Sequence, residues 1–221
     1  MPEYEHGKQT RQRILDVTRG LFWVKGYEQT RFEDYSKQYG INTGLVHYYF
    51  KKKEALLHEI YADVVAKTDL IASELTNADQ HLLHYIVLYH LMWYYFGNCP
   101  EYARLVQAAV KLRLHSEIVY PAVLNWCYVF DECYALGLSK QDCKVCSLAV
   151  VGGQVELMNA FFSGMLQMDA LSYAQYDVAN ALKMLGIPQT AVNTAVGQVE
   201  YLMKPYFFTM TEGFVPGYSV G

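Results

Sequence analysis

Apolar residues recur every three to four positions along most of this chain, and no stretch shows a convincing alternation of apolar and polar residues. The pattern therefore predicts an all-α fold. Three short helices are expected first, over about 10–25, 30–39 and 43–50. Gly26 follows the first of them and suits the left-handed residue that ends a helix.

The segment between the first helix and the third carries strong turn and capping signals. Thr30 and Glu33 have the spacing of a capping box, in which each side chain satisfies a free amide at the start of a helix. Gly40 permits a tight turn, and Asn42 is a good N-cap for the next helix. This spacing predicts a helix-turn-helix.

The rest of the chain reads as longer helices. An amphipathic helix over 53–75 would span roughly 35 Å, enough to link two domains. The helix over 80–97 is apolar nearly all round, which predicts the centre of a bundle. The remaining helices are expected near 101–115, 117–136, 140–165, 172–185 and 189–204.

These elements divide the chain into an amino-terminal helix-turn-helix domain over 1–52 and a larger helical bundle over 53–205. The tail over 206–221 shows no clear period, and we expect it to be irregular.

Composition excludes disorder, since 52% of the residues are hydrophobic and 18% are charged. The first twelve residues, MPEYEHGKQTRQ, lack the apolar core of a signal peptide, and no apolar run reaches 18 residues. We therefore expect a cytoplasmic protein with no membrane partner. The net charge is −4, yet residues 1–60 hold 10 Lys/Arg against 8 Asp/Glu, so the basic bias lies in the amino-terminal part.

The run over 10–56 contains, in order, TRQRIL, LFWVKGY, the capped second helix, GINTG, YYF and KKKEAL. This run resembles the DNA-binding domain of the TetR family of bacterial transcriptional regulators. The resemblance implies a ligand-responsive regulator, most often a repressor, that binds a palindromic operator in double-stranded DNA as a homodimer. Leu45 stands where a small polar residue is usual, so no operator sequence carries over.

A recognition helix contacts base edges with its first turn, which here holds Thr43, Gly44 and Leu45. The resemblance implies phosphate contacts at His47, Tyr49 and Lys53. The other reading of Tyr48 and Tyr49 is core packing. The full set expected at DNA is Thr30, Arg31, Asn42, Thr43, Gly44, Leu45, His47, Tyr48, Tyr49 and Lys53.

Residues 81–134 hold twelve aromatic side chains, many with a polar end, which is typical of small-molecule pockets. The sequence predicts an apolar or aromatic effector. The alternative is that these rings only fill a core, and that an isolated arginine lies at the surface. The expected ligand-binding residues are Tyr89, Trp93, Arg104, Trp126 and Phe130.

The segment 147–166 combines glycines with a long apolar face, and close approach of two helices would offset the cost of the glycines. The resemblance also implies a four-helix dimer interface here. A helix buried within one protomer is the alternative. The expected interface residues are Val151, Val155, Met158, Phe162, Val192, Val196, Val199 and Met203.

Other chemistry has weak support. Cys143 and Cys146 form a single CxxC, with Cys127 and Cys133 upstream, and metal or redox sensing stays open beside simple burial. No motif of a hydrolase, nucleotide-binding loop or zinc protease occurs, so we expect no enzyme, no metal and no cofactor. The alternative function is a helical small-molecule binding protein whose DNA role is lost or secondary.

Overall fold

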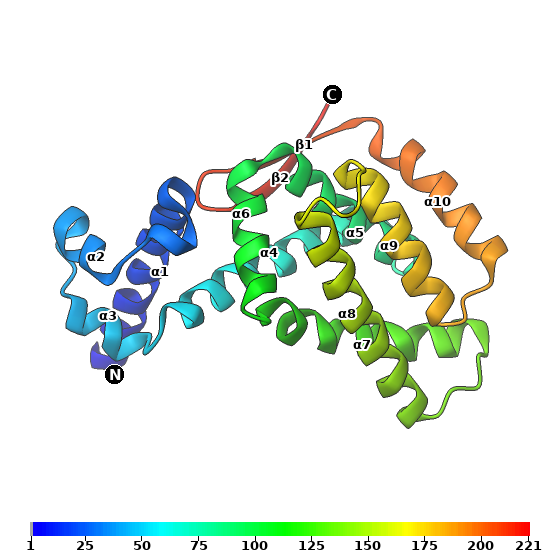
Figure 1. Cartoon of the computed structure of the whole chain (residues 1–221), viewed down its shortest axis with the longest axis horizontal. Coiled ribbons are helices and arrows are strands. Elements are labelled where there is room, and N and C mark those ends of the chain that lie inside the picture. Colours follow the sequence, from blue (N-terminus) through cyan, green and yellow to red (C-terminus); the bar gives the residue numbers. More distant parts are fainter. Residues whose placement is uncertain (1) are drawn as a thin grey trace.

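The computed structural model describes residues 2–221, with side chains from residue 6 onward. The described chain forms ten helices and one β-hairpin (Figure 1). The helices are α1 (Pro2–Gln29), α2 (Phe32–Tyr39), α3 (Thr43–Tyr49), α4 (Lys53–Leu75), α5 (His81–Asn98), α6 (Pro100–Lys111), α7 (Leu114–Tyr134), α8 (Lys140–Phe162), α9 (Ala170–Met184) and α10 (Gln189–Met203), and the strands are β1 (Tyr206–Thr211) and β2 (Val215–Val220). The predicted all-α class, with a helix-turn-helix ahead of a larger bundle, is confirmed.

Helices α1, α2 and α3 form the amino-terminal unit at one end of the molecule (Figure 1). α1 begins earlier than the predicted residue 10, and Gly26 interrupts it with φ 77° and ψ 165°, as its sequence signal indicated. Tyr35, Ile41 and Val46 bury their side chains in the small core between the three helices. The Tyr35 hydroxyl lies 2.7 Å from Thr18 Oγ1, so this core satisfies the polar end of a bulky ring.

The predicted capping box at Thr30 is wrong. Thr30 is buried, and its hydroxyl donates to the Gly26 carbonyl at 2.8 Å. The N-cap of α2 is Arg31, one residue later than predicted, and the Asp34 carboxylate accepts a hydrogen bond from the Arg31 amide at 2.9 Å. The hydroxyl is drawn inward because the break at Gly26 leaves carbonyls without helical partners. Glu33 stays exposed.

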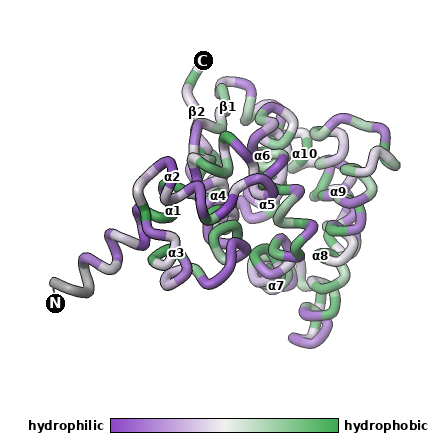
Figure 2. The backbone as a smooth tube through the Cα atoms, turned by 60° about the vertical axis from the view of Figure 1, so that its left-hand side comes forward, coloured by the Kyte–Doolittle hydropathy of each residue, from purple (hydrophilic) through white to green (hydrophobic). Residues whose placement is uncertain are grey.

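α4 has the predicted bounds and joins the amino-terminal unit to the bundle. Within the bundle, α5 lies in the middle, in contact with α4, α6, α7, α9, α10 and β1 (Figures 1 and 2). Leu82, Val87 and Leu91 are among its buried side chains. The prediction that the most uniformly apolar helix is central is confirmed.

The expectation of an irregular tail is wrong, because residues 206–220 form an antiparallel β-hairpin. Phe208 pairs with Tyr218 and is buried, whereas its neighbour Phe207 is exposed. Aromatic residues on both faces hid the alternation in the sequence. At the turn, Gly213 (φ 78°) and Phe214 (φ 62°) adopt left-handed conformations that close a short hairpin loop.

The hairpin turn lies against the amino-terminal unit. Phe214 is fully buried and packs its ring on Trp23 of α1, with centroids 5.2 Å apart. Arg19 of α1 donates to the Gly213 carbonyl at 3.1 Å. The last residues of the chain therefore tie the amino-terminal helices to the bundle.

α8 leaves much of its apolar surface uncovered. It is the one helix within residues 2–221 that is long and apolar enough to cross a membrane, with a mean hydropathy of 1.4 over 18 residues of which 28% are buried. A single helix of this kind is weak support for a membrane span, because packed helices reach the same hydropathy.

Candidate nucleic-acid interface and ligand cavity

The turn between α2 and α3 is built from backbone geometry that its residues favour. Gly40 has φ 64°, and its amide donates to the Ser36 carbonyl at 3.2 Å. Asn42 caps α3 by accepting the Gly44 amide at 2.7 Å. Val46 then anchors α3 in the core from the side opposite its exposed face.

The exposed face of α3 carries the chemistry suited to a DNA groove. Leu45 is 39% exposed and Tyr48 is 76% exposed, which is unusual for large apolar residues on so short a helix. His47 is exposed as well, and its ring packs on Phe32 with centroids 4.2 Å apart. Tyr49 is half-buried and meets Tyr48 edge-to-face at 5.0 Å.

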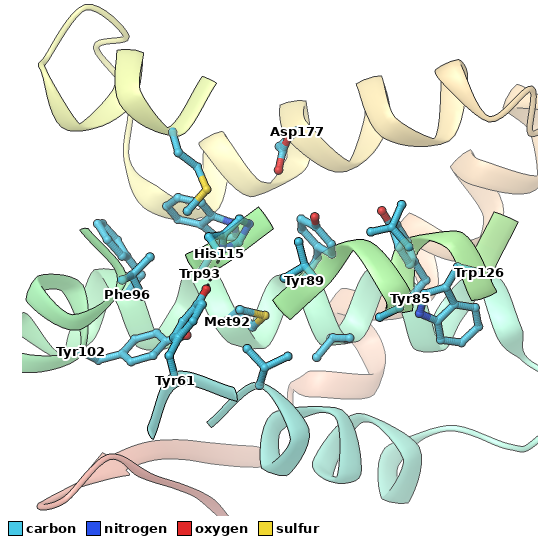
Figure 3. A pocket seen from close by; sticks show the side chains of 17 residues that line it. Tyr61, Tyr85, Tyr89, Met92, Trp93, Phe96, Tyr102, His115, Trp126 and Asp177 are labelled. Carbon is cyan, nitrogen blue, oxygen red and sulfur yellow. Dashed lines mark hydrogen bonds between the residues drawn. The ribbon is translucent and has the colours of Figure 1, made fainter. Parts of the chain in front are cut away.

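A cavity of about 60 Å³ lies inside the bundle (Figure 3). Its wall combines aromatic rings, methionines and aliphatic side chains from six successive helices, α4 to α9. The lining residues are Tyr61, Val65, Tyr85, Leu88, Tyr89, Met92, Trp93, Phe96, Tyr102, Val106, His115, Val119, Ala122, Val123, Trp126, Met158 and Asp177.

Few polar groups line this cavity. The Tyr61 hydroxyl on α4 lies 2.8 Å from His115 Nδ1 on α7. Burial holds the pKa of His115 at about 4, so the imidazole is neutral at physiological pH. The hydroxyls of Tyr85 and Tyr102 are buried without a hydrogen-bond partner. A buried hydroxyl without a hydrogen-bond partner costs free energy. Such groups are typical of a pocket in which a bound ligand supplies the partner.

Asp177 is the one carboxylate on the cavity wall. It lies on α9 and is 2% exposed, and in Figure 3 its carboxylate points into the cavity beside Tyr89. Burial raises its pKa to about 7.

Comparison with known proteins gives the amino-terminal unit its identity. Residues 14–60 match the family described as bacterial regulatory proteins, tetR family. The amino-terminal unit is a TetR-family domain. A search of the curated proteins found no match to the chain.

Solved structures show the same fold over most of the chain. RolR in complex with resorcinol is 17% identical with a TM-score of 0.67, covering 87% of this chain and 95% of RolR. RolR without ligand is 18% identical with a TM-score of 0.63, covering 84% and 96%. TylP, a TetR regulator from Streptomyces fradiae, is 17% identical with a TM-score of 0.52, covering 89% and 94%.

In the TetR-family domain, the structure separates the predicted DNA residues into two groups. Those whose side chains or backbone lie on the accessible side of α2 and α3 are Arg31, Asn42, Thr43, Gly44, Leu45, His47, Tyr48 and Tyr49. Thr30 and Lys53 form the second group, and their side chains make hydrogen bonds within the protomer. Thr30 and Arg31 were expected at DNA as residues of a helix amino terminus, but neither backbone amide is free for a phosphate, because Thr30 N donates to the Tyr27 carbonyl and Arg31 N to Asp34.

Lys53 serves the core of the TetR-family domain. Its ammonium donates to the Tyr27 carbonyl at 2.7 Å and the Thr30 carbonyl at 3.0 Å, and lies 4.2 Å from the centroid of the Tyr27 ring. Partial burial lowers its pKa. The neighbouring Lys51 and Lys52 are exposed.

Three of the five predicted ligand residues, Tyr89, Trp93 and Trp126, line the cavity. Phe130 lies behind the wall, stacked on Trp126 with centroids 5.7 Å apart. Arg104 lies elsewhere, with its guanidinium donating to the Trp23 carbonyl at 2.9 Å where α6 packs on α1. The sequence interpretation missed Asp177 and His115, although an acid among the apolar residues of α9 was a usable signal.

Most of the predicted dimer residues pack inside the protomer. Those that are buried are Val151, Met158, Val192, Val199 and Met203, and Val155 and Phe162 are half-buried. Only Val196, at 41%, is exposed. Side chains that are buried in the protomer are not free to contact a second copy, whereas Val155, Phe162 and Val196 keep part of their surface accessible.

Over residues 145–156, the exposed side of α8 carries apolar and small residues together with one acid, Glu156. Val145 is 55% exposed and Leu148 is 60% exposed, and Gly152 and Gly153 follow along the same side. A Cβ added at either glycine would meet no atom within 4 Å. We call Val145, Leu148, Gly152 and Gly153 the α8 face.

Two of the five cysteines, Cys127 on α7 and Cys143 on α8, lie next to each other where these helices pack. Cys127 and Cys143 are buried, and burial next to Cys143 raises the pKa of the Cys127 thiol to about 12. A thiol with so high a pKa is a poor nucleophile and a poor redox sensor. No group of three metal-ligating side chains occurs in the described part of the chain.

Proposed function

We propose that this protein is a ligand-responsive transcriptional repressor that binds a palindromic operator as a homodimer, with α3 in the major groove. The observation that carries the proposal is the position of α4. Its residues Tyr61 and Val65 line the cavity, and the same helix is held to the TetR-family domain. A small molecule in the cavity therefore acts on the helix that positions α3.

Ion pairs join α1 of the domain to α4. Arg11 pairs with Glu59, and Arg19 lies 2.6 Å from Asp63. Asp63 also accepts Lys67 at 2.8 Å. Because these contacts fix α1 to one side of α4, a displacement of α4 carries the whole three-helix unit with it.

The cavity is too small for a ring-sized ligand, so binding of such a ligand would displace α4. A volume of about 60 Å³ is well below the roughly 150 Å³ that holds a benzene ring in an engineered protein cavity. A ring-sized effector must therefore push the wall outward. RolR, whose fold is similar, is known with resorcinol bound. A coupling of about 1–3 kcal/mol between cavity and α3 would change operator affinity roughly 5- to 150-fold.

The first experiment selects binding sites from random duplex DNA with the purified full chain. Enrichment of a palindrome supports the proposal. The absence of any enriched site favours the alternative of a small-molecule binding protein without a DNA role.

A variant of α3 tests the groove assignment. We expect Leu45→Asp to weaken binding to the selected duplex at least tenfold, because a carboxylate on the exposed face of α3 meets the phosphate-rich groove. The measurement is a fluorescence-anisotropy titration at two salt concentrations. Leu70→Asp is the matched control, since Leu70 is an exposed leucine of α4 at 58%. Equal affinities for the two variants would contradict the assignment.

The α8 face supports the homodimer. Exposed apolar side chains and glycines over residues 145–156 of this 23-residue helix, with Glu156 as the one acid among them, form a surface that a second copy can cover. Two recognition helices related by a two-fold axis then read two half-sites about one turn of DNA apart.

We expect Leu148→Arg to raise the dimer dissociation constant at least tenfold, because a charge would be buried against its symmetry mate. Sedimentation equilibrium measures the change, and Leu70→Arg is the control. An unchanged dissociation constant would place the interface on another surface.

A further inference from the structure

The carboxylate of Asp177 has no partner. It is 2% exposed and forms no hydrogen bond or ion pair with any other described residue. Its carboxylate points into the cavity, and the cavity connects it to the rings of Tyr85 and Tyr89 on α5 (Figure 3). An unpaired carboxylate inside a protein is expensive, so such a group is kept where something else supplies its partner.

Nothing on the cavity wall can supply a positive charge. No lysine or arginine lines it, and burial keeps His115, the one basic side chain there, in its neutral form. Arg104, the arginine that the sequence predicted at the ligand, does not line the cavity and donates instead to the Trp23 carbonyl of α1. The Asp177 carboxylate can therefore be neutralised only by its own proton or by a cationic ligand.

The rest of the wall suits an organic cation. The rings of Tyr89 and Trp93 belong to the cavity wall, and Tyr173, which is not a lining residue, packs on Trp93 at 4.2 Å between centroids. Aromatic faces attract cations through their negative quadrupole, and the attraction grows when water is excluded. An anion in the same place would meet a buried carboxylate with no compensating charge.

We propose that the cavity binds a small organic amine, with its ammonium group at the Asp177 carboxylate and its hydrocarbon part among the aromatic rings. This assignment names the effector class of the proposed regulator and so rests on that proposal for its role in transcription. The binding event itself does not depend on DNA.

The test uses three probes of the same shape and different charge: 2-phenylethylamine, 2-phenylethanol and phenylacetate. Isothermal titration calorimetry with the full chain at pH 7.5 measures the affinity of each. We expect the amine to bind at least tenfold more tightly than the alcohol, and the carboxylate to bind most weakly.

Asp177→Asn keeps the size of the side chain and removes its charge. We expect this variant to lose at least tenfold in affinity for the amine and to change little for the alcohol. Glu132→Gln is the control, because Glu132 is an exposed acid of α7 away from the cavity wall. Circular dichroism spectra establish that both variants are folded before titration.

Proton release gives a second readout that a purely structural Asp177 would not produce. Since burial raises the pKa of Asp177 to about 7, the free protein holds a proton there in a large fraction of molecules at neutral pH. An arriving ammonium displaces that proton into solvent. Titrations in buffers of different ionisation enthalpy should show net proton release for the amine with the wild type and none with Asp177→Asn.

Three results would overturn the assignment. The alcohol binding as tightly as the amine would indicate a neutral donor such as a phenol, and tighter binding of phenylacetate would reverse the expected charge. Binding of none of the three probes at millimolar concentration would remove small amines as the ligand class. None of these results would change the outcome of the DNA selection. Failure of that selection would likewise not change the measured affinity for the amine, so the two proposals can fail independently.

Discussion

Phe214→Ala is expected to lower the free energy of unfolding by about 3–5 kcal/mol, the range found when a buried phenylalanine is removed from a core. Phe214 is fully buried, although only seven residues follow it in the sequence. Its ring fills the space beside Trp23 of α1, where no other part of the bundle replaces it. Urea denaturation followed by circular dichroism measures the change.

The hairpin offers its own control. Phe207→Ala makes the same truncation on β1, but Phe207 is 66% exposed. Its cost should stay within about 1 kcal/mol. If the two variants lose the same stability, the hairpin turn does not hold the amino-terminal helices to the bundle.

The hairpin also shows why part of the fold could not be predicted from the sequence. The periodicity that predicts helices depends on one face being apolar, and α4 follows that rule over Lys53–Leu75. β1 does not follow the corresponding rule for strands, since Phe207 faces solvent next to the buried Phe208. The hairpin packs instead on elements distant in the chain, with β1 on α5, β2 on α4 and the turn residue Phe214 on Trp23 of α1.

The same limit applies to the site residues. The exposed face of α3 could be predicted because helix capping at Asn42 and burial at Val46 fix which residues point outward. Lys53 could not be placed, because the carbonyls that hold it belong to Tyr27 and Thr30 at the end of another helix. Local pattern determines an element, and packing between elements determines which of its polar groups stay free.

The cavity follows this division. The aromatic density of residues 81–134 predicted a pocket and three of its lining residues, Tyr89, Trp93 and Trp126. Asp177 and His115 come from α9 and α7, and only the packed bundle brings them to the same cavity. Their burial has a thermodynamic consequence that tests the cavity without any ligand.

Asp177 and His115 should give opposite dependences of stability on pH. The pKa of Asp177 rises from 3.8 to about 7 on folding, so its contribution to stability is full below pH 3.8 and is lost as the pH rises to about 7. The pKa of His115 falls from 6.5 to about 4, so folding is penalised as the pH falls from 6.5 to 4. At 1.36 kcal/mol per pKa unit, the change is roughly 4 kcal/mol for Asp177 and roughly 3 kcal/mol for His115.

In the wild type the two effects largely cancel between pH 4 and 6.5, because folding then takes up one proton at Asp177 and releases one at His115. Single variants uncover each slope. Relative to the wild type, Asp177→Asn should lose stability steadily as the pH falls over this range, and His115→Gln should lose it as the pH rises. The double variant should run parallel to the wild type, which makes it the internal control. Urea unfolding curves at half-unit pH intervals give the free energies, and single variants that also run parallel to the wild type would mean that neither group is held in its buried, uncharged form.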